Sequence, residues 1–473
     1  MAGKQADEMA ARPAIRLLKH LFRELGLTVV FRSSLDTKLL ILQRFVRMFA
    51  YGGSSLILVS FLSSLGISDS RIGLFMALTL VGDVVISLGL SLVTDAFGRK
   101  RMLTVGSLLM GISGIMFGLS ANFWLLLAAA TIGIISPCGN EIGPFRAIEE
   151  STLSQLTPAD DRADVFAWYN LIGTVGIALG MVVSGWLVSA AEMREHWDRS
   201  DAYRVVFFLY AAVGFTMLLM TLSLSGECEV HDDASVVSEE EEESTPLLPK
   251  TKKKTSLLPS FSPSRRRLCI TLSMLFGLDA FATSLATLSW TADYFKRKFS
   301  MPAGHLGSLF FAISILGTVS ILVAASLARR FGNVKTMVYC HLPSAVALAF
   351  LGIPDSRPLA ITLLVIRASS QYMDAAPRSS FLADILRPEE RTAFMGVINV
   401  VKTGVSSMGP IITGVFVENH LVWIVFLMAG ILKAVYDFSI LASFLNYETE
   451  GEQKRHEQDE VDETDEAVVG SRG

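Results

Sequence analysis

The chain alternates long apolar segments with short polar connections over most of its length. Many apolar segments run for about twenty residues, the length that an α-helix needs to cross a bilayer core of roughly 30 Å. The pattern therefore predicts an all-α, polytopic membrane protein. We expect twelve transmembrane helices, at residues 39–64, 71–93, 102–120, 123–150, 163–190, 204–225, 268–292, 305–328, 336–352, 359–385, 392–417 and 422–446.

A long internal repeat organises these helices. The segment from Gly139 to Gly180 reads as the end of one span, a polar turn and the start of the next. A weaker copy lies about 230 residues downstream, from Gln371 to Pro410. The equivalent positions are Pro158 and Pro388, Arg162 and Arg391, Asn170 and Asn399, Thr174 and Thr403, and Gly180 and Gly409. The repeat predicts two related six-helix halves, and parallel helical repeats with buried charges are typical of secondary transporters.

Polar segments set the expected domain boundaries and the orientation. The N-terminal segment contains a basic amphipathic helix, with Arg16, Lys19 and Arg23 on one face, that either lies on the cytosolic membrane surface or packs on the protein itself. The bias of Lys and Arg toward loops on one side predicts that both termini are cytosolic. We expect a cytosolic segment at 1–38, six-helix halves at 39–225 and 268–446, a disordered cytosolic linker at 226–267 and an acidic disordered tail at 447–473.

The composition supports a membrane protein and excludes several other classes. Apolar residues make up 51% of the chain and charged residues 18%, and the mean hydropathy is +0.48, which is too apolar for a soluble globular chain. The four cysteines have no paired spacing, so we expect no disulfide and no metal site, and the N-terminus lacks the pattern of a cleavable signal peptide. Since no phosphate-binding glycine loop or nucleophile–base pattern is present, we expect neither an enzyme nor an ATP-driven pump, and no cofactor.

The turn after the second predicted span carries a motif. It reads SLVTDAFGRKRML, from Ser91 to Leu103, and resembles the loop between helices 2 and 3 of the major facilitator superfamily, G-x-x-x-D-(R/K)-x-G-R-(R/K). Ser91 and Ala96 depart from that motif. The second half echoes it in ASLARRFGNVK, which keeps Gly332 but has Arg329 at the position of the aspartate. The matching residues are Asp95, Gly98, Arg99 and Lys100.

This resemblance covers nearly the whole chain and implies alternating access, with helices 1, 4, 7 and 10 lining a central cavity. The motif loop would latch one conformation of the cycle, which would make Asp95 and Arg99 gating residues. Two other family signatures are absent. Ala129 stands where proton antiporters carry an arginine in helix 4, and the helix 5 glycines lack the proline found in drug antiporters. For these glycines we favour a role in close helix packing.

Ionisable residues inside the predicted spans are candidates for the substrate or proton pathway, because such residues are costly in a membrane and usually functional. Their cationic surplus suggests an anionic or zwitterionic substrate, since arginine binds carboxylate and phosphate groups bidentately. The alternative is internal pairing, between Asp374 and Arg378 or between Arg146 and Glu150, with some arginines snorkelling to the surface. The candidates are Arg44, Arg47, Asp83, Glu141, Arg146, Asp279, Arg367, Asp374, Arg378 and Lys402; we leave out Glu149, Glu150 and Asp384, near predicted helix ends.

Within this set, Glu141 and Asp374 are our candidates for proton carriers. Both lie on expected cavity helices, near corresponding places in the two halves, and a carboxylate buried there can carry a proton. Asn170 and Asn399 occupy equivalent repeat positions. They either bond the substrate or, in the interpretation that we favour, hold their helices to neighbours.

Two features bear on the placement of the chain. Trp290 and Tyr294 lie near a predicted helix end, where we expect them in an interfacial aromatic belt. The segment from Glu243 to Leu247 and Leu248 matches the acidic dileucine pattern E-x-x-x-L-L, which resembles a eukaryotic sorting signal toward vacuoles or lysosomes. A sorting adaptor would be its partner, and the plasma membrane is the alternative location.

Taken together, these features favour a fungal or other eukaryotic transporter of the major facilitator type. The leading hypothesis is proton-coupled movement of a small organic or inorganic anion by alternating access. The first alternative is efflux of drugs or other xenobiotics, and the second is a membrane sensor or scaffold that has lost transport. We expect a monomer in the bilayer whose partners are its substrate and protons, without nucleic acid.

Overall fold

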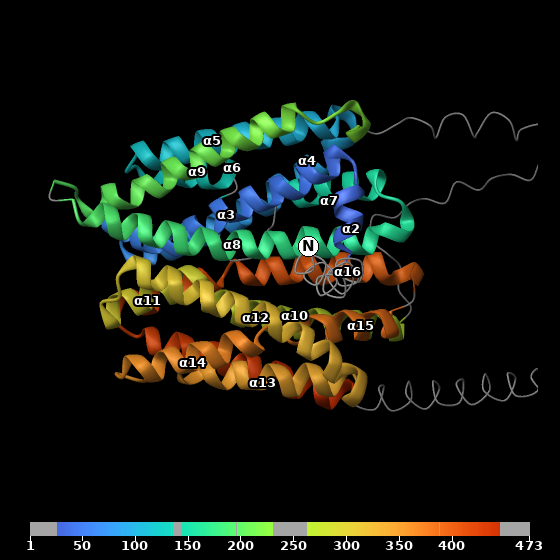
Figure 1. The fold of residues 1–473 in the computed structure, drawn as a ribbon. Coiled ribbons are helices and arrows are strands. Elements are labelled where there is room, and N and C mark those ends of the chain that lie inside the picture. Colours follow the sequence, from blue (N-terminus) through green and yellow to red (C-terminus); the bar gives the residue numbers. More distant parts are fainter. Residues whose placement is uncertain are drawn as a thin grey trace, which may run out of the picture. The chain divides into compact units, whose positions relative to one another are not determined.

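The computed structural model describes residues 26–133, 135, 144–194, 196–229, 263–386 and 388–444. All regular elements in these residues are helices (Figure 1). Two of them, Ala159–Asp161 and Gly226–Cys228, are short 3-10 turns. The α-helices are α2 (Leu27–Arg32), α3 (Leu35–Ser64), α4 (Asp69–Phe97), α5 (Arg99–Leu119), α6 (Phe123–Ile132), α7 (Pro144–Leu156), α8 (Arg162–Glu192), α9 (Arg199–Leu222), α10 (Pro263–Leu285), α11 (Leu288–Phe299), α12 (Ala303–Phe331), α13 (Asn333–Leu351), α14 (Arg357–Ser370), α15 (Ala375–Ile385), α16 (Pro388–Ser406), α17 (Gly409–Glu418) and a last helix, Val422–Phe444.

The all-helical membrane fold is confirmed. Among the described residues, nine helices are long and apolar enough to cross a membrane, judged by length and composition. Each of the twelve predicted spans overlaps at least one described helix. The count of twelve stays a prediction, because residues 136–143 of the fourth span lie outside the described residues.

The chain forms two compact units. Unit 1 comprises Met1–Ile67, Leu78–Ser256 and Ser300–Phe311, and unit 2 comprises Ser68–Ala77, Leu257–Phe299 and Ala312–Gly473. The first turns of α4 therefore belong to unit 2, and the first turns of α12 belong to unit 1.

Glycines allow the helices of unit 1 to pack at short distance. A Cβ atom at Gly180 of α8 would lie only 1.9 Å from the carbonyl oxygen of Phe49 on α3, and one at Gly176 would lie 2.6 Å from that of Phe45. Figure 1 shows α3 and α8 side by side, as are α5 and α9. Small residues let helix backbones approach in this way, so the packing role predicted for the helix 5 glycines is confirmed.

Three of the predicted spans in unit 2 are broken helices. Span 268–292 divides between α10 and α11 at Ala286 and Thr287, and span 359–385 divides between α14 and α15. The third break separates α16 from α17. A break frees backbone groups inside a membrane, and transporters place substrate and ion sites at such points.

Unit 2 has an apolar core built from α10, α13, α15, α16 and the last helix. Phe276, Phe381, Phe394 and Tyr436 are all buried in it. The aromatic belt predicted for Trp290 and Tyr294 is wrong, because these side chains are 2% and 4% exposed. They pack inside the unit, where the Tyr294 hydroxyl donates to the carbonyl of Leu351 at 3.0 Å.

Candidate functional site

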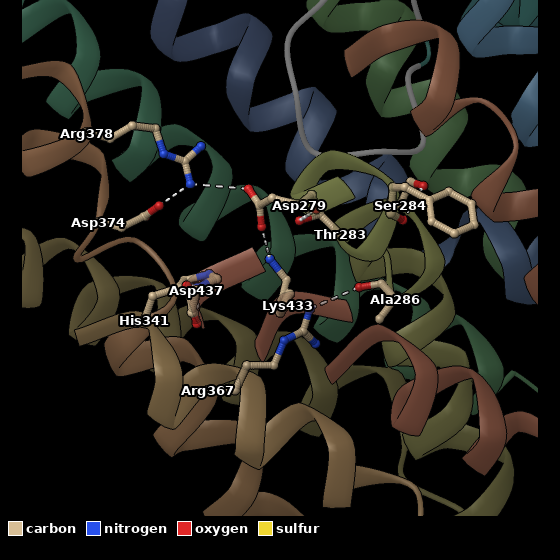
Figure 2. Close-up of polar contacts among 11 residues, drawn as sticks. Asp279, Thr283, Ser284, Ala286, His341, Arg367, Asp374, Arg378, Lys433 and Asp437 are labelled. Atoms are coloured by element: carbon tan, nitrogen blue, oxygen red, sulfur yellow. Dashed lines mark hydrogen bonds and ion pairs between the residues drawn. The ribbon is translucent and has the colours of Figure 1, made fainter. Parts of the chain in front are cut away.

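A set of buried charges in unit 2 is centred on Asp279 of α10. Lys433 of the last helix donates to one oxygen of this carboxylate at 2.7 Å, and Arg378 of α15 donates to the other at 3.2 Å. Figure 2 shows the two cations reaching Asp279 from different helices. A carboxylate held by two cations in a buried place is strongly favoured in its ionised form.

Arg378 links this carboxylate to a second one. Its guanidinium also pairs with the carboxylate of Asp374. Asp374 lies four residues earlier in the chain and is the N-cap residue of α15. The same guanidinium lies over the rings of Phe276 and Tyr436, 5.2 and 5.7 Å from their centroids. The pairing of Asp374 with Arg378 that we gave as the alternative is therefore confirmed, while their functional roles stay predictions.

His341 of α13 and Asp437 of the last helix form an adjoining pair. The imidazole Nδ1 lies 2.8 and 3.1 Å from the two carboxylate oxygens, and the side chains are 2% and 1% exposed. Asp437 lies one helical turn after Lys433, on the same face of the last helix. We name the six residues His341, Asp437, Lys433, Asp279, Arg378 and Asp374 the charge cluster.

Three members of the charge cluster were missed by sequence reasoning. Lys433 and Asp437 fall inside the last predicted span, and His341 falls inside span 336–352. The signal that could have found the first two is a lysine and an aspartate four apart in an apolar segment, since such residues share a helix face and are rarely placed in a membrane without function.

Two further cations of unit 2 stand beside the charge cluster. Arg367 of α14 is 9% exposed and donates from one nitrogen to the carbonyl of Ala286, at the break between α10 and α11, at 3.0 Å (Figure 2). Within the described residues its buried Nε has no hydrogen-bond partner and its guanidinium has no carboxylate within 4.0 Å. Lys402 of α16 is half-buried and, in the same part of the chain, also has no ion-pair partner.

Unit 1 has its own buried ion pair. Arg47 of α3 binds Glu149 of α7 through two hydrogen bonds of 2.7 Å, and the Tyr169 hydroxyl donates to the same carboxylate at 2.5 Å. Glu149 is 0% exposed. Leaving Glu149 out as a residue near a helix end was wrong, because α7 continues to Leu156 and buries it.

The other predicted pathway residues of unit 1 have different environments. Arg44 is buried with its guanidinium over the Tyr169 ring, 4.8 Å from the centroid, and Asp83 of α4 is also buried. Arg146 pairs with Glu150 at 2.7 Å in an exposed place, as the pairing alternative predicted. Glu141 lies outside the described residues.

The motif loop contacts the segment that follows α9. Gly98 has a φ of +89°, which favours glycine, and the Glu229 carboxylate accepts from the backbone N–H groups of Arg99 and Lys100 at 2.7 and 3.3 Å. The Arg99 side chain donates to Gln155 of α7 at 2.6 Å. The side chain of Asp95 lies outside the description, so its gating role stays a prediction.

The remaining candidate residues are the two repeat-related asparagines and the sorting motif. The Asn170 amide donates to a carbonyl of its own helix, that of Phe166, at 3.0 Å, and both Asn170 and Asn399 are exposed within their units. The sorting motif of Glu243, Leu247 and Leu248 lies outside the described residues.

Comparison with known proteins fits this geometry. The sequence model of the Major Facilitator Superfamily matches residues 40–366 and 272–468. The Uncharacterized membrane protein YJR124C of Saccharomyces cerevisiae is 32% identical over 425 residues, which are 87% of this chain and 95% of that protein. Quinolone resistance protein NorA of Staphylococcus aureus is 23% identical over 387 residues, 80% of this chain and 89% of that protein.

Solved structures show the same fold. A bacterial homolog to the human lysosomal transporter Spinster, inward-facing and occupied, has a TM-score of 0.66 at 14% identity, covering 87% of this chain and 97% of that one. The nucleoside transporter NupG has a TM-score of 0.64 at 17% identity, covering 87% and 99%. The similarity to a yeast protein agrees with the predicted fungal origin. The chain therefore belongs to the major facilitator superfamily, and it is an integral membrane transporter rather than an enzyme.

Proposed function

We propose that this transporter moves a small organic or inorganic anion together with protons. The observation that carries the proposal is Arg367, a buried guanidinium without a carboxylate partner among the described residues. Burying an unpaired charge costs several kcal/mol, so a protein keeps one mainly where a ligand will compensate it. A guanidinium binds carboxylate and phosphate groups through two parallel hydrogen bonds, which favours an anionic ligand.

The position of Arg367 supports a ligand site. It lies in the last turn of α14 and contacts Ala286 at the break between α10 and α11. Broken helices at mid-span form the substrate sites of many secondary transporters, because their free backbone groups bind ligand atoms. An anion at this break would meet both the guanidinium and backbone groups.

The charge balance of unit 2 points the same way. Apart from Asp293, whose ion-pair partner Arg297 is exposed, the interior of its described part holds the cations Arg367, Arg378, Lys402 and Lys433 and the carboxylates Asp279, Asp374 and Asp437. With His341 neutral, this is a surplus of one positive charge. Protons would be carried by buried ionisable side chains, for which the sequence alone offered Glu141 and Asp374 as candidates.

Efflux of drugs or other xenobiotics is the second candidate. Similarity to a quinolone resistance protein over 80% of the chain favours it. Glu149 and Glu150, which the sequence-based count left out, pair with Arg47 and Arg146 and so reduce the expected cationic surplus.

For the cellular arrangement we propose a monomer with both termini in the cytosol. The acidic dileucine motif at Glu243 would recruit a sorting adaptor and direct the protein to a vacuole or lysosome. Replacing Leu247 and Leu248 with alanine should move a fluorescent fusion to the plasma membrane, and an unchanged distribution would contradict this role.

A ligand screen tests the substrate class. Detergent-purified protein is heated with phosphate, lactate, succinate, glutamate or the lipophilic cation tetraphenylphosphonium, and the melting temperature Tm is recorded. An anion at about 100 times its Kd should stabilise the wild type by about 2.7 kcal/mol. Arg367→Gln should lose this stabilisation, whereas Arg146→Gln, which removes an exposed paired arginine, should keep it.

The opposite pattern would contradict the proposal. Stabilisation by tetraphenylphosphonium alone, equal in Arg367→Gln and the wild type, would favour xenobiotic efflux. Arg367 would then be a structural residue that supports the break at Ala286.

A further inference from the structure

We infer that the His341–Asp437 pair is the proton-binding site of this transporter and that Lys433 transmits its protonation state to Asp279. The inference deepens the proposed function and rests on it for the coupling to a solute. It stands on the geometry of the charge cluster, in which this pair differs from the other carboxylates.

The other carboxylates of the charge cluster are already compensated. Asp279 is held by Lys433 at 2.7 Å and Arg378 at 3.2 Å, and Asp374 is held by Arg378. A proton arriving at either would have to displace a cation. Asp437, in contrast, has the imidazole of His341 as its hydrogen-bond partner.

Protonation of His341 gives Asp437 a cationic partner. Asp279 and Asp374 already have theirs in Lys433 and Arg378, whereas the partner of Asp437 among the described residues is the imidazole. A proton taken from water by His341 turns this contact into an ion pair, which a buried place of low dielectric strengthens. Since Nδ1 already faces the carboxylate, the proton binds at Nε2, and the product is an imidazolium–carboxylate pair.

The groups that face His341 come from every element packed on it. Asp437, Lys433 and the Tyr436 ring, 6.1 Å from the imidazole, come from the last helix, and Asp279 comes from α10. Helices α14 and α15 add three further groups, which are Arg367, Arg378 and Asp374. Asp437 is therefore the nearest group that favours the imidazolium, while Lys433 is a neighbouring cation that opposes it.

Lys433 connects this site to α10. It lies one helical turn before Asp437, so its ammonium can serve either Asp279, as in this structure, or Asp437. When His341 is protonated, Asp437 is compensated and Lys433 stays on Asp279. When the proton leaves, the charge of Asp437 draws Lys433 away, and the contact between α10 and the last helix weakens.

Charge displacement after a pH jump tests the inference without a substrate. Proteoliposomes are adsorbed on a solid-supported membrane, the pH is stepped between 8.5 and 5 without solute, and the transient current is integrated. Wild-type protein should displace charge with a single pH midpoint. His341→Gln should reduce the displaced charge to less than about a tenth, whereas His305→Gln, which removes an exposed histidine of α12, should leave it unchanged.

Two more variants separate a proton site from a structural role. Asp437→Asn removes the counter-ion of the imidazolium, so the midpoint of the displaced charge should move to lower pH. Lys433→Met removes the opposing cation, so the midpoint should move to higher pH. These opposite shifts do not depend on His341→Gln folding, and a Tm for each variant identifies unfolded samples.

Several results would overturn the inference. One is the absence of displaced charge in the wild type, and another is an unchanged displaced charge in His341→Gln. A third is a pH midpoint that does not fall in Asp437→Asn or does not rise in Lys433→Met. The proposed function fails separately. If no anion raises the Tm in a way that depends on Arg367 but the displaced charge is normal, the anionic substrate is refuted and the proton site stands. If an anion does raise the Tm in this way but the displaced charge is absent, only the proton site is refuted.

Discussion

Glu149→Gln should lower the free energy of unfolding of unit 1 far more than the position of Glu149 near a predicted helix end suggests. The substitution keeps the size of the side chain but removes the negative charge that Arg47 binds, and the Arg47 side chain is only 6% exposed. Removing one partner of a buried ion pair typically costs about 3–5 kcal/mol. That is a change of roughly 150- to 5,000-fold in the unfolding equilibrium.

The same helix supplies the control. Glu150 pairs with Arg146, but these side chains are 33% and 46% exposed, and exposed pairs contribute about 0–1 kcal/mol. Glu150→Gln should therefore leave the free energy of unfolding within about 1 kcal/mol of the wild type. The measurement is the unfolding midpoint in mixed micelles of dodecyl maltoside and sodium dodecyl sulfate, followed by far-ultraviolet circular dichroism.

A double variant separates the lost pair from the charge left behind. Arg47→Met with Glu149→Leu removes both charges, so most of the loss should be recovered. A remainder of about 1–3 kcal/mol is expected, because the Tyr169 hydroxyl loses its acceptor. Equal unfolding midpoints for Glu149→Gln and Glu150→Gln would refute the reasoning from burial. A double variant that is less stable than Glu149→Gln would refute the argument that an uncompensated buried charge causes the loss.

Three further predictions concern helix packing, the motif loop and a buried thiol. Gly180→Ala should lower the Tm because its Cβ would meet the backbone of α3, whereas Gly396→Ala, in open space on α16, should not; equal effects would contradict the packing. Gly98→Ala should also lower the Tm, since φ is +89° and the Glu229 carboxylate lies 2.8 Å from the added Cβ; an unchanged Tm would contradict the strain. Burial and the carboxylate of Asp36 raise the pKa of Cys228 to about 12, so this thiol is protonated at pH 8. The stability that this thiol contributes is complete below the pKa of the unfolded chain and is lost progressively as pH rises from there to about 12. Mass spectrometry should show iodoacetamide reacting with it about a thousandfold more slowly in the folded than in the unfolded chain, and equal rates would contradict the shift.

Sequence patterns predicted the helices because lipid exposure requires continuous apolar segments, and hydropathy reports these directly. The same signal could not show the breaks within the spans. Ala286 and Thr287 separate α10 from α11, yet neither residue is a glycine or proline that would mark a break. Hydropathy is the same for a bent and a straight span, so the break follows from packing in unit 2.

The partners of buried charges could be predicted only where they are close together in the sequence. The pair of Asp374 and Arg378 was predictable because residues four apart share a helix face. Arg47 and Glu149 are 102 residues apart, and only the packing of α3 against α7 brings them together. The missed pair of His341 and Asp437, 96 residues apart, joins α13 to the last helix in the same way.

Proton movement during transport tests the central claim most directly. Proteoliposomes with the pH dye pyranine inside receive whichever anion of the screen stabilised the protein most, and the internal pH is followed. The account predicts that the added anion moves protons with it, and that Asp279→Asn, which removes the shared acceptor of Lys433 and Arg378, reduces both fluxes to less than about a tenth. Anion entry without a change of internal pH, or fluxes unaffected by Asp279→Asn, would contradict it.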